Sequence, residues 1–148
     1  MRLTFYAIRL YKLFLSNKKK YLYIPLGLYW LLIFVLTTIP GSHIPKLFGI
    51  SDKIKHFGAY LVLAFLLNFA LFLQKKYKNI TKNSHLFTII IVAFYGLFDE
   101  IHQIFIPGRS FDWWDLLADL LGSLFGILLV KIMLKISNEK EDDFVELS

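Results

Sequence analysis

The chain has 148 residues, of which 57% are apolar and 19% are charged, and its net charge is +6. An average soluble domain is about 45–50% apolar and about 25% charged, so this composition excludes a disordered chain and argues against a soluble globule. The sequence holds no cysteine, which excludes disulfides, zinc–thiolate sites and cysteine nucleophiles. The composition therefore indicates an integral membrane protein. We expect no nucleic-acid partner, because the basic residues form no face free of apolar sequence.

Residues 1–20 form a basic segment ahead of the first long apolar stretch. Arg2, Arg9 and Ser16 recur at intervals of seven and share one helical face, while most residues between them are apolar. This pattern is typical of an amphipathic helix that lies in the membrane interface. A disordered basic leader is the alternative. Since no small-residue cleavage pattern follows the apolar stretch, we expect an uncleaved anchor.

Four stretches are long and apolar enough to cross a bilayer, which takes about 20 helical residues. They are residues 21–39, 54–73, 86–106 and 116–134. Helices are expected, because isolated strands leave their backbone groups unsatisfied in lipid. The sequence thus predicts an all-α membrane protein with a four-transmembrane-helix bundle. Its three parts are the N-terminal segment 1–20, a transmembrane domain 21–135 and an acidic tail 136–148.

The distribution of Lys and Arg predicts the orientation in the membrane. Thirteen of the 17 basic residues lie in the segment before the first span, in the second loop and near the C-terminus. Four lie in the other two loops: Lys46, Lys53, Lys55 and Arg109. Because cytoplasmic loops carry the excess of positive charge, we expect both termini in the cytoplasm of a multi-pass cell-membrane protein.

Polar residues gather at the ends of the spans that this orientation places outside the cell. They are Asp52, Lys53, Lys55, His56, Tyr60, Asp99, Glu100, His102, Gln103, Arg109, Asp112, Asp115 and Asp119. At 1.5 Å per residue, Asp99 lies roughly 10 Å from the expected end of its helix. A charge at the centre of a membrane helix costs about 2.5–3.5 kcal/mol. We therefore expect these acids to face partners, water or a ligand.

Helical spacing places several of these residues on common faces. Asp99 and Glu100 lie four and three residues before Gln103, so all three share one side of their helix. Asp115, Asp119, Gly122 and Gly126 follow at i, i+4, i+7 and i+11 on another. The two glycines let a second helix approach closely, either in the bundle or in an oligomer through the Gly122/Gly126 face.

The order and spacing of these residues resemble the VanZ-like family of small membrane proteins. The resemblance rests on Lys53, His56, Tyr60, Glu100, Gln103, Phe105, Pro107, Arg109, Asp115, Asp119 and Gly122. Asp119 stands where the family usually has Asn. The resemblance implies a ligand-binding site formed by Lys53, His56, Tyr60, Glu100, Gln103, Arg109, Asp115 and Asp119. The family is named for a protein linked to resistance to teicoplanin, a glycopeptide that acts on cell-wall precursors outside the membrane.

Three functions stay open at this stage. In the first, a non-enzymatic envelope protein binds an anionic membrane lipid or a lipid-linked wall precursor in an outward pocket and affects glycopeptide susceptibility. In the second, a membrane hydrolase or transferase uses Asp99 or Glu100 as the base and His56 or His102 as the acid, with Arg109 stabilising charge. In the third, the protein is a small transporter subunit, which the acids within the membrane spans would suit.

A divalent metal is compatible with these carboxylates, because they suit hard cations. No metal-ligand spacing motif is present, however, so the sequence assigns no metal ligands and no cofactor. Structural roles compete with the functional ones: Asp112 and Asp115 suit a helix N-terminus. Arg109 suits an ion pair with Asp99 or Glu100, and the histidines suit helix packing.

The predicted orientation can be tested by labelling. Cysteines introduced at Ser42 and Ser110 are expected to react with a membrane-impermeant maleimide in intact cells, because both lie in loops predicted to face outward. The natural chain has no cysteine, so it is the background control. Labelling that needs permeabilised cells would show the opposite orientation.

Overall fold

The computed structural model describes residues 2–43 and 52–146, and their side chains over 5–42 and 52–137. All regular elements in these ranges are helical, and none is a strand. In chain order they are α1 (Arg2–Ser16), the π-helical turn η1 (Lys19–Tyr23), α2 (Ile24–Thr37), the 3-10 turn η2 (Gly41–His43), α3 (Asp52–Leu73), α4 (Lys78–Lys82), α5 (Ser84–Gln103) and α6 (Trp113–Glu146).

Four helical segments are long and apolar enough to span a membrane: Lys19–Thr37, Asp52–Leu73, Ser84–Gln103 and Trp113–Ser137. Their outward faces carry exposed apolar side chains such as Leu28, Phe94 and Leu124, which a bilayer would cover. The prediction of an all-α membrane protein with four spanning helices is therefore confirmed.

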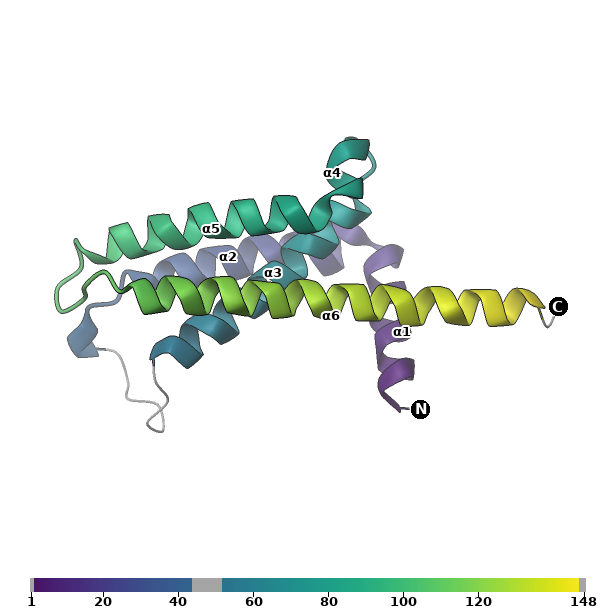
Figure 1. The fold of residues 1–148 in the computed structure, drawn as a ribbon, viewed down its shortest axis with the longest axis horizontal. Coiled ribbons are helices and arrows are strands. Elements are labelled where there is room, and N and C mark those ends of the chain that lie inside the picture. The colour runs from purple at the N-terminus through teal and green to yellow at the C-terminus, as the bar shows by residue number, and fades with distance from the viewer. Residues whose placement is uncertain (1, 44–51, 147–148) are drawn as a thin grey trace.

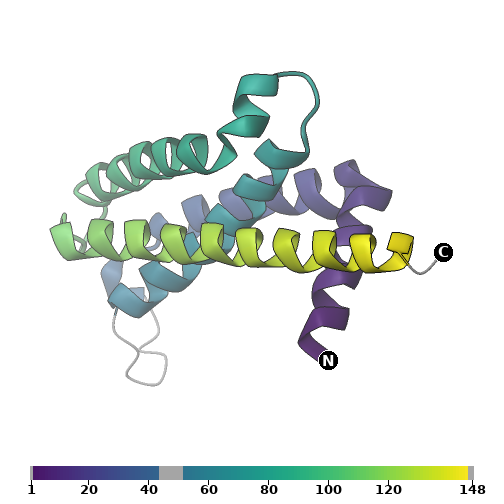
Figure 2. The same ribbon diagram turned by 45° about the vertical axis from the view of Figure 1, so that its right-hand side comes forward.

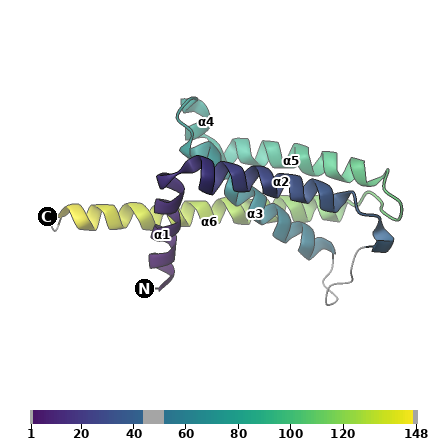
Figure 3. The same cartoon turned by 180° about the vertical axis from the view of Figure 1, so that it is seen from behind.

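The four spanning helices run side by side, with α3 lying obliquely behind α6 (Figure 1). The helix α1 crosses the bundle at one end, as the view from behind also shows (Figure 3). Both described ends of the chain lie at that same end, with α6 extending beyond the bundle (Figure 2). The C-terminal ends of α2 and α5 lie at the opposite end of the bundle (Figure 1).

The contact between α3 and α6 is the most extensive in the bundle. A Cβ atom at Gly122 would lie 2.2 Å from the Phe57 carbonyl oxygen, and one at Gly126 would lie 2.4 Å from that of Leu61. Only glycine lets the two backbones come this close. We expected the Gly122/Gly126 face to pack either in the bundle or in an oligomer. In the structure α3 of the same chain covers this face, so an oligomer would need another surface.

Residues 2–16 form a helix rather than an irregular leader, because α1 has an apolar side to pack. Phe14 is buried in a cluster with Leu22, Phe69 and Val130 from three other helical segments. Asn17 ends α1, and its side-chain oxygen accepts a hydrogen bond from the Lys20 amide at 3.1 Å. The position of α1 in the membrane interface stays a prediction.

The ends of α5 and α6 differ from those predicted. Instead of continuing to residue 106, α5 ends at Gln103, because the Phe105 and Ile106 amides bond back to carbonyls three residues earlier. Asp99 is therefore four residues from the helix end, about 6 Å rather than 10 Å. The helix α6 passes residue 134 and continues to Glu146, so part of the predicted acidic tail is helical.

Two glycines permit the close contact between the loop after α2 and the loop after α5. Gly108 has a φ of 74°, which residues with a Cβ rarely adopt. The Gly41 amide donates a hydrogen bond to the Pro107 carbonyl at 3.0 Å, and a Cβ at Gly41 would lie 2.1 Å from the Gly108 oxygen. This contact fixes the end of α2 beside the loop that carries Arg109.

Gly122→Ala is expected to destabilise the protein by about 1–3 kcal/mol, because the new methyl group would collide with the α3 backbone. Thermal unfolding in detergent would measure the effect. Gly58→Ala is the matched control, since a Cβ at Gly58 meets no atom within 4 Å and alanine favours helix. Equal melting temperatures for the two variants would contradict the close α3–α6 contact.

Candidate functional site

The candidate site lies where the start of α3, the end of α5 and the start of α6 meet. Each helix presents polar residues on the side that faces the other two, in the arrangement expected from their spacing. Five acids or amides of this region are buried: Asp99, Glu100, Gln103, Asp115 and Asp119. Since buried polar groups need partners, the contacts among them determine what the site can do.

The residues of α5 form the first part of the site. The Gln103 side-chain amide donates to Glu100 Oε1 at 3.2 Å, and its nitrogen lies 3.4 Å from Asp99 Oδ2. The other Glu100 oxygen accepts a hydrogen bond from the Asp112 backbone amide at 2.8 Å. Glu100 therefore ties the end of α5 to the start of α6 while it is completely buried.

The residues of α3 face α6 and carry the positive charge. Lys53 donates hydrogen bonds to Asp112 and, at 2.9 Å, to Asp115. The Lys53 ammonium holds the pKa of the Asp112 carboxyl below its usual value. His56 Nδ1 lies 3.0 Å from Asp119 Oδ1, and its Nε2 lies 3.8 Å from Asp115 Oδ2. The two α3 residues thus contact Asp112, just before α6, and Asp115 and Asp119 on the first two turns of α6.

Asp112 also has the structural role that the sequence suggested for it. Its side chain accepts a hydrogen bond from the Trp114 amide at 2.8 Å, which caps the start of α6. Asp115 directs a carboxylate oxygen to Lys53 instead. Asp112 therefore both caps α6 and bonds to Lys53, whereas Asp115 contributes only to the interhelical cluster.

Arg109 connects the site to α2. Its guanidinium donates to the Gln103 side-chain oxygen at 3.3 Å and to the Leu36 backbone carbonyl at 3.5 Å. The Leu36 carbonyl lies at the end of α2, where it also accepts a hydrogen bond from the Ile39 amide at 3.3 Å. Among the described residues, Arg109 thus bonds to these two acceptors and does not form the expected ion pair with Asp99 or Glu100.

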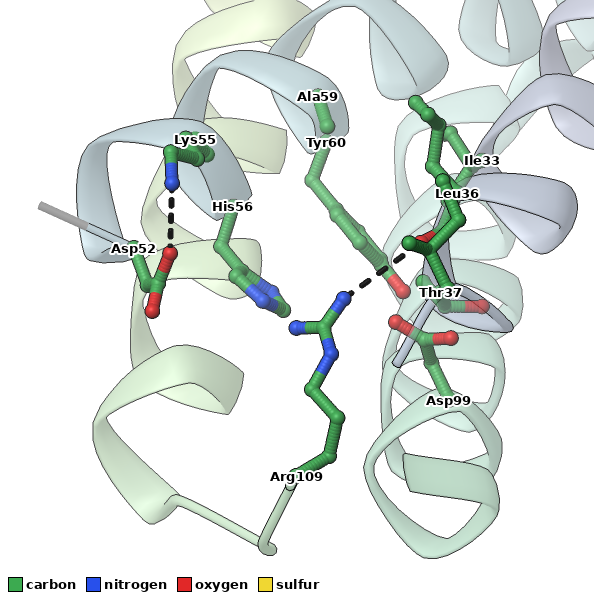
Figure 4. Close-up of a pocket in the computed structure, with 11 residues that line it drawn as sticks. Ile33, Leu36, Thr37, Asp52, Lys55, His56, Ala59, Tyr60, Asp99 and Arg109 are labelled. Carbon is green, nitrogen blue, oxygen red and sulfur yellow. Dashed lines mark hydrogen bonds and ion pairs between the residues drawn. The ribbon is translucent and has the colours of Figure 1, made fainter. Parts of the chain in front are cut away.

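A cavity of about 330 Å³ opens beside this cluster. Its lining residues are Ile33, Leu36, Thr37, Ile39, Asp52, Lys55, His56, Ala59, Tyr60, Asp99 and Arg109. The walls from α2 are mostly apolar, and the far end is polar. In Figure 4 the Tyr60 hydroxyl and the Asp99 carboxylate point toward one another, with Arg109 reaching in from the loop. The cavity therefore combines an apolar wall with a charged end.

Some predicted residues lie outside this arrangement. The ring of His102 stacks on Phe34 and Phe98, with centroids 5.4 Å and 6.2 Å away. This is the packing role that the sequence left open. Asp52 and Lys55 pair with each other at 2.9 Å at the edge of the cavity.

Two residues that the structure places at the site were not identified from the sequence. Thr37 is buried at the end of α2 and lines the cavity. Gly96 lies one turn before Asp99, and a Cβ there would be 3.0 Å from Asp119 Oδ2 and 3.5 Å from the Tyr60 ring. Gly96 lies three residues before Asp99 and therefore on the polar side of the helix. This spacing could have identified Gly96 as a residue of the site from the sequence.

The fold and this cluster define a class: a small membrane protein of four spanning helices with a buried polar site at one end. A family model described as VanZ/LLP1 matches residues 3–134, which is most of the chain, and the chain belongs to that family. No curated protein and no solved structure matches it.

The stability of two variants would show what the acid at position 119 does. Asp119→Asn introduces the residue usual in the family and is expected to leave the melting temperature unchanged or higher in metal-free detergent buffer. Its amide oxygen can still accept from His56, and a buried charge is removed. Asp119→Ala is expected to cost about 1–3 kcal/mol, because His56 loses its partner. Equal losses in both variants would contradict this account.

Proposed function

We propose that this VanZ-like membrane protein binds the anionic headgroup of an envelope lipid or a lipid-linked cell-wall precursor in the cavity beside Arg109. The observation that carries the proposal is the composition of the cavity. Ile33, Leu36 and Ile39 supply apolar walls, and Arg109 supplies a cation at the polar end. A ligand with an apolar chain next to a charged head matches both parts.

Arg109 is the residue best suited to contact the anion. Its two hydrogen bonds, at 3.3 Å and 3.5 Å, are long for a guanidinium. Its Nε is buried and bonds to no group in the described part of the chain. A phosphate or carboxylate would offer shorter, charge-assisted bonds in their place. Lys53 is less suitable, because Asp112 and Asp115 already engage its ammonium.

The distribution of basic residues supports an outward-facing cavity. Thirteen of 17 lie in segments predicted to be cytoplasmic, and the cavity lies at the opposite end of the bundle. Lipid-linked wall precursors are used on that outer side. Altered susceptibility to glycopeptides, which act on such precursors, is therefore part of the proposal.

A membrane hydrolase or transferase is the second candidate, and one contact favours it. The Asp119 carboxylate accepts from His56 Nδ1 at 3.0 Å, which leaves Nε2 to transfer a proton. Asp99 and Glu100 each have an oxygen near this ring and could act as the base. The same pocket would then bind the phosphorylated substrate.

Native mass spectrometry of the purified protein with a polyprenyl diphosphate, and separately with phosphatidylglycerol, would test the first proposal. Arg109→Ala is expected to lower the bound fraction at least tenfold, because it removes the cation at the cavity. Lys82→Ala is the control, since Lys82 is an exposed cation before α5, at the other end of the bundle. Equal binding by wild type and Arg109→Ala would contradict the proposal.

The same samples would separate binding from catalysis. If the protein is an enzyme, the mass of the added diphosphate lipid changes with time, and His56→Ala abolishes the change while binding persists. An unchanged lipid mass with wild-type protein would count against the enzyme.

A further inference from the structure

We propose that His56, Asp99 and Glu100 form a binding site for a divalent transition-metal ion, Zn²⁺ or Mn²⁺. Each residue offers one ligand atom, and the three atoms lie within 4.8 Å of one another. His56 comes from α3, whereas the two acids come from α5, so only the folded bundle brings them together. All three side chains are at least nine-tenths buried, which would shield a bound ion from water.

The charge of the surrounding cluster favours a cation. Its carboxylates belong to Asp99, Glu100, Asp112, Asp115 and Asp119, and the cations among the described residues around them are Lys53 and Arg109. With all five carboxyl groups ionised and His56 neutral, three negative charges are left unbalanced. Removing such charges from water costs several kcal/mol each unless they are compensated. One divalent ion would reduce the excess to a single charge.

A buried hydroxyl provides evidence that does not depend on the acids. Tyr60 is 1% exposed, and its hydroxyl makes no hydrogen bond to any group in the described ranges. It points into the space beside Asp99 (Figure 4). A buried O–H group is rarely left without an acceptor. A water molecule on the metal, or a ligand oxygen there, would provide one.

The orientation of His56 is that of a metal ligand. Asp119 engages Nδ1 at 3.0 Å, which fixes the ring. Nε2 lies 3.8 Å from Asp115 Oδ2, too far for a hydrogen bond, so its lone pair can bind a metal. Histidines that bind metals commonly donate their other N–H to a carboxylate in this way. An imidazole with two carboxylates suits Zn²⁺ or Mn²⁺, whereas Ca²⁺ and Mg²⁺ prefer oxygen ligands alone. Metal–ligand bonds of about 2.0–2.2 Å would draw the three side chains together by rotation about their own bonds.

The metal would change what the cavity can bind. The cluster without it carries excess negative charge, which repels an anion even with Arg109 present. A metal ion next to Asp99, which also lines the cavity, would add a second cation for a phosphate oxygen. Only this effect of the metal on anion binding rests on the proposed lipid ligand. The metal site itself does not depend on that proposal.

The test uses the full chain, purified in detergent and stripped with a chelator. Titration with Zn²⁺ or Mn²⁺ alone is expected to give about one ion per wild-type chain by elemental analysis and calorimetry. Asp99→Asn and His56→Gln should each weaken binding at least tenfold, because they remove a ligand. Asp52→Asn and His85→Gln should stay within twofold, because Asp52 pairs with Lys55 at the edge of the cavity and His85 lies at the far end of α5.

Absence of metal binding by wild type would overturn the proposal, as would equal losses in Asp99→Asn and Asp52→Asn. A measurement on the wild-type protein does not depend on whether the variants fold. The electron spin echo of bound Mn²⁺ should show ¹⁴N modulation from the imidazole. Absence of this modulation would overturn the assignment of His56 as a ligand. Metal binding without a lipid adduct would contradict only the proposed function. A lipid adduct on metal-free protein that binds no added metal would overturn only the metal site.

Discussion

The backbone contact between α3 and α6 determines most of the geometry of this protein. Gly122 and Gly126 admit the carbonyl groups of Phe57 and Leu61 at distances that no other residue permits. Asp115 lies two turns before Gly122, and Asp119 lies two turns before Gly126, all on the same face of α6. The close approach therefore carries them to Lys53 and His56. The fold thus positions the polar cluster through the packing of small residues.

The cost of burying charge constrains the site in turn. Three of the four buried acids bond to a group on a neighbouring helix or loop: Asp115 to Lys53, Asp119 to His56 and Glu100 to the Asp112 amide. Leaving a buried polar group without its partner costs about 1–3 kcal/mol, so the cluster holds the ends of three helices in one arrangement. Such rigidity suits a binding site, because the polar groups need not be ordered when a ligand arrives.

The cavity and the cluster serve complementary purposes in the proposals made above. The apolar walls of α2 suit a chain that lies in the bilayer, and Arg109 with a metal ion suits a phosphorylated head. The excess of acids would otherwise oppose an anionic ligand, so the metal site reconciles the charge of the cluster with the proposed ligand. Both ideas rest on side chains from helices that are far apart in sequence.

The sequence by itself determined the four spans, the common side of Asp99, Glu100 and Gln103, and the capping role of Asp112. Helix geometry fixes spacings of three and four residues, and apolar length fixes a span, so these features are local. Only the tertiary structure decided that Arg109 bonds to Gln103 and Leu36, that His102 stacks on phenylalanines, and that His56 joins two acids of α5. Those contacts depend on how closely the helices approach one another. The packing at the glycines sets this distance, and it cannot be derived from the sequence of one helix alone.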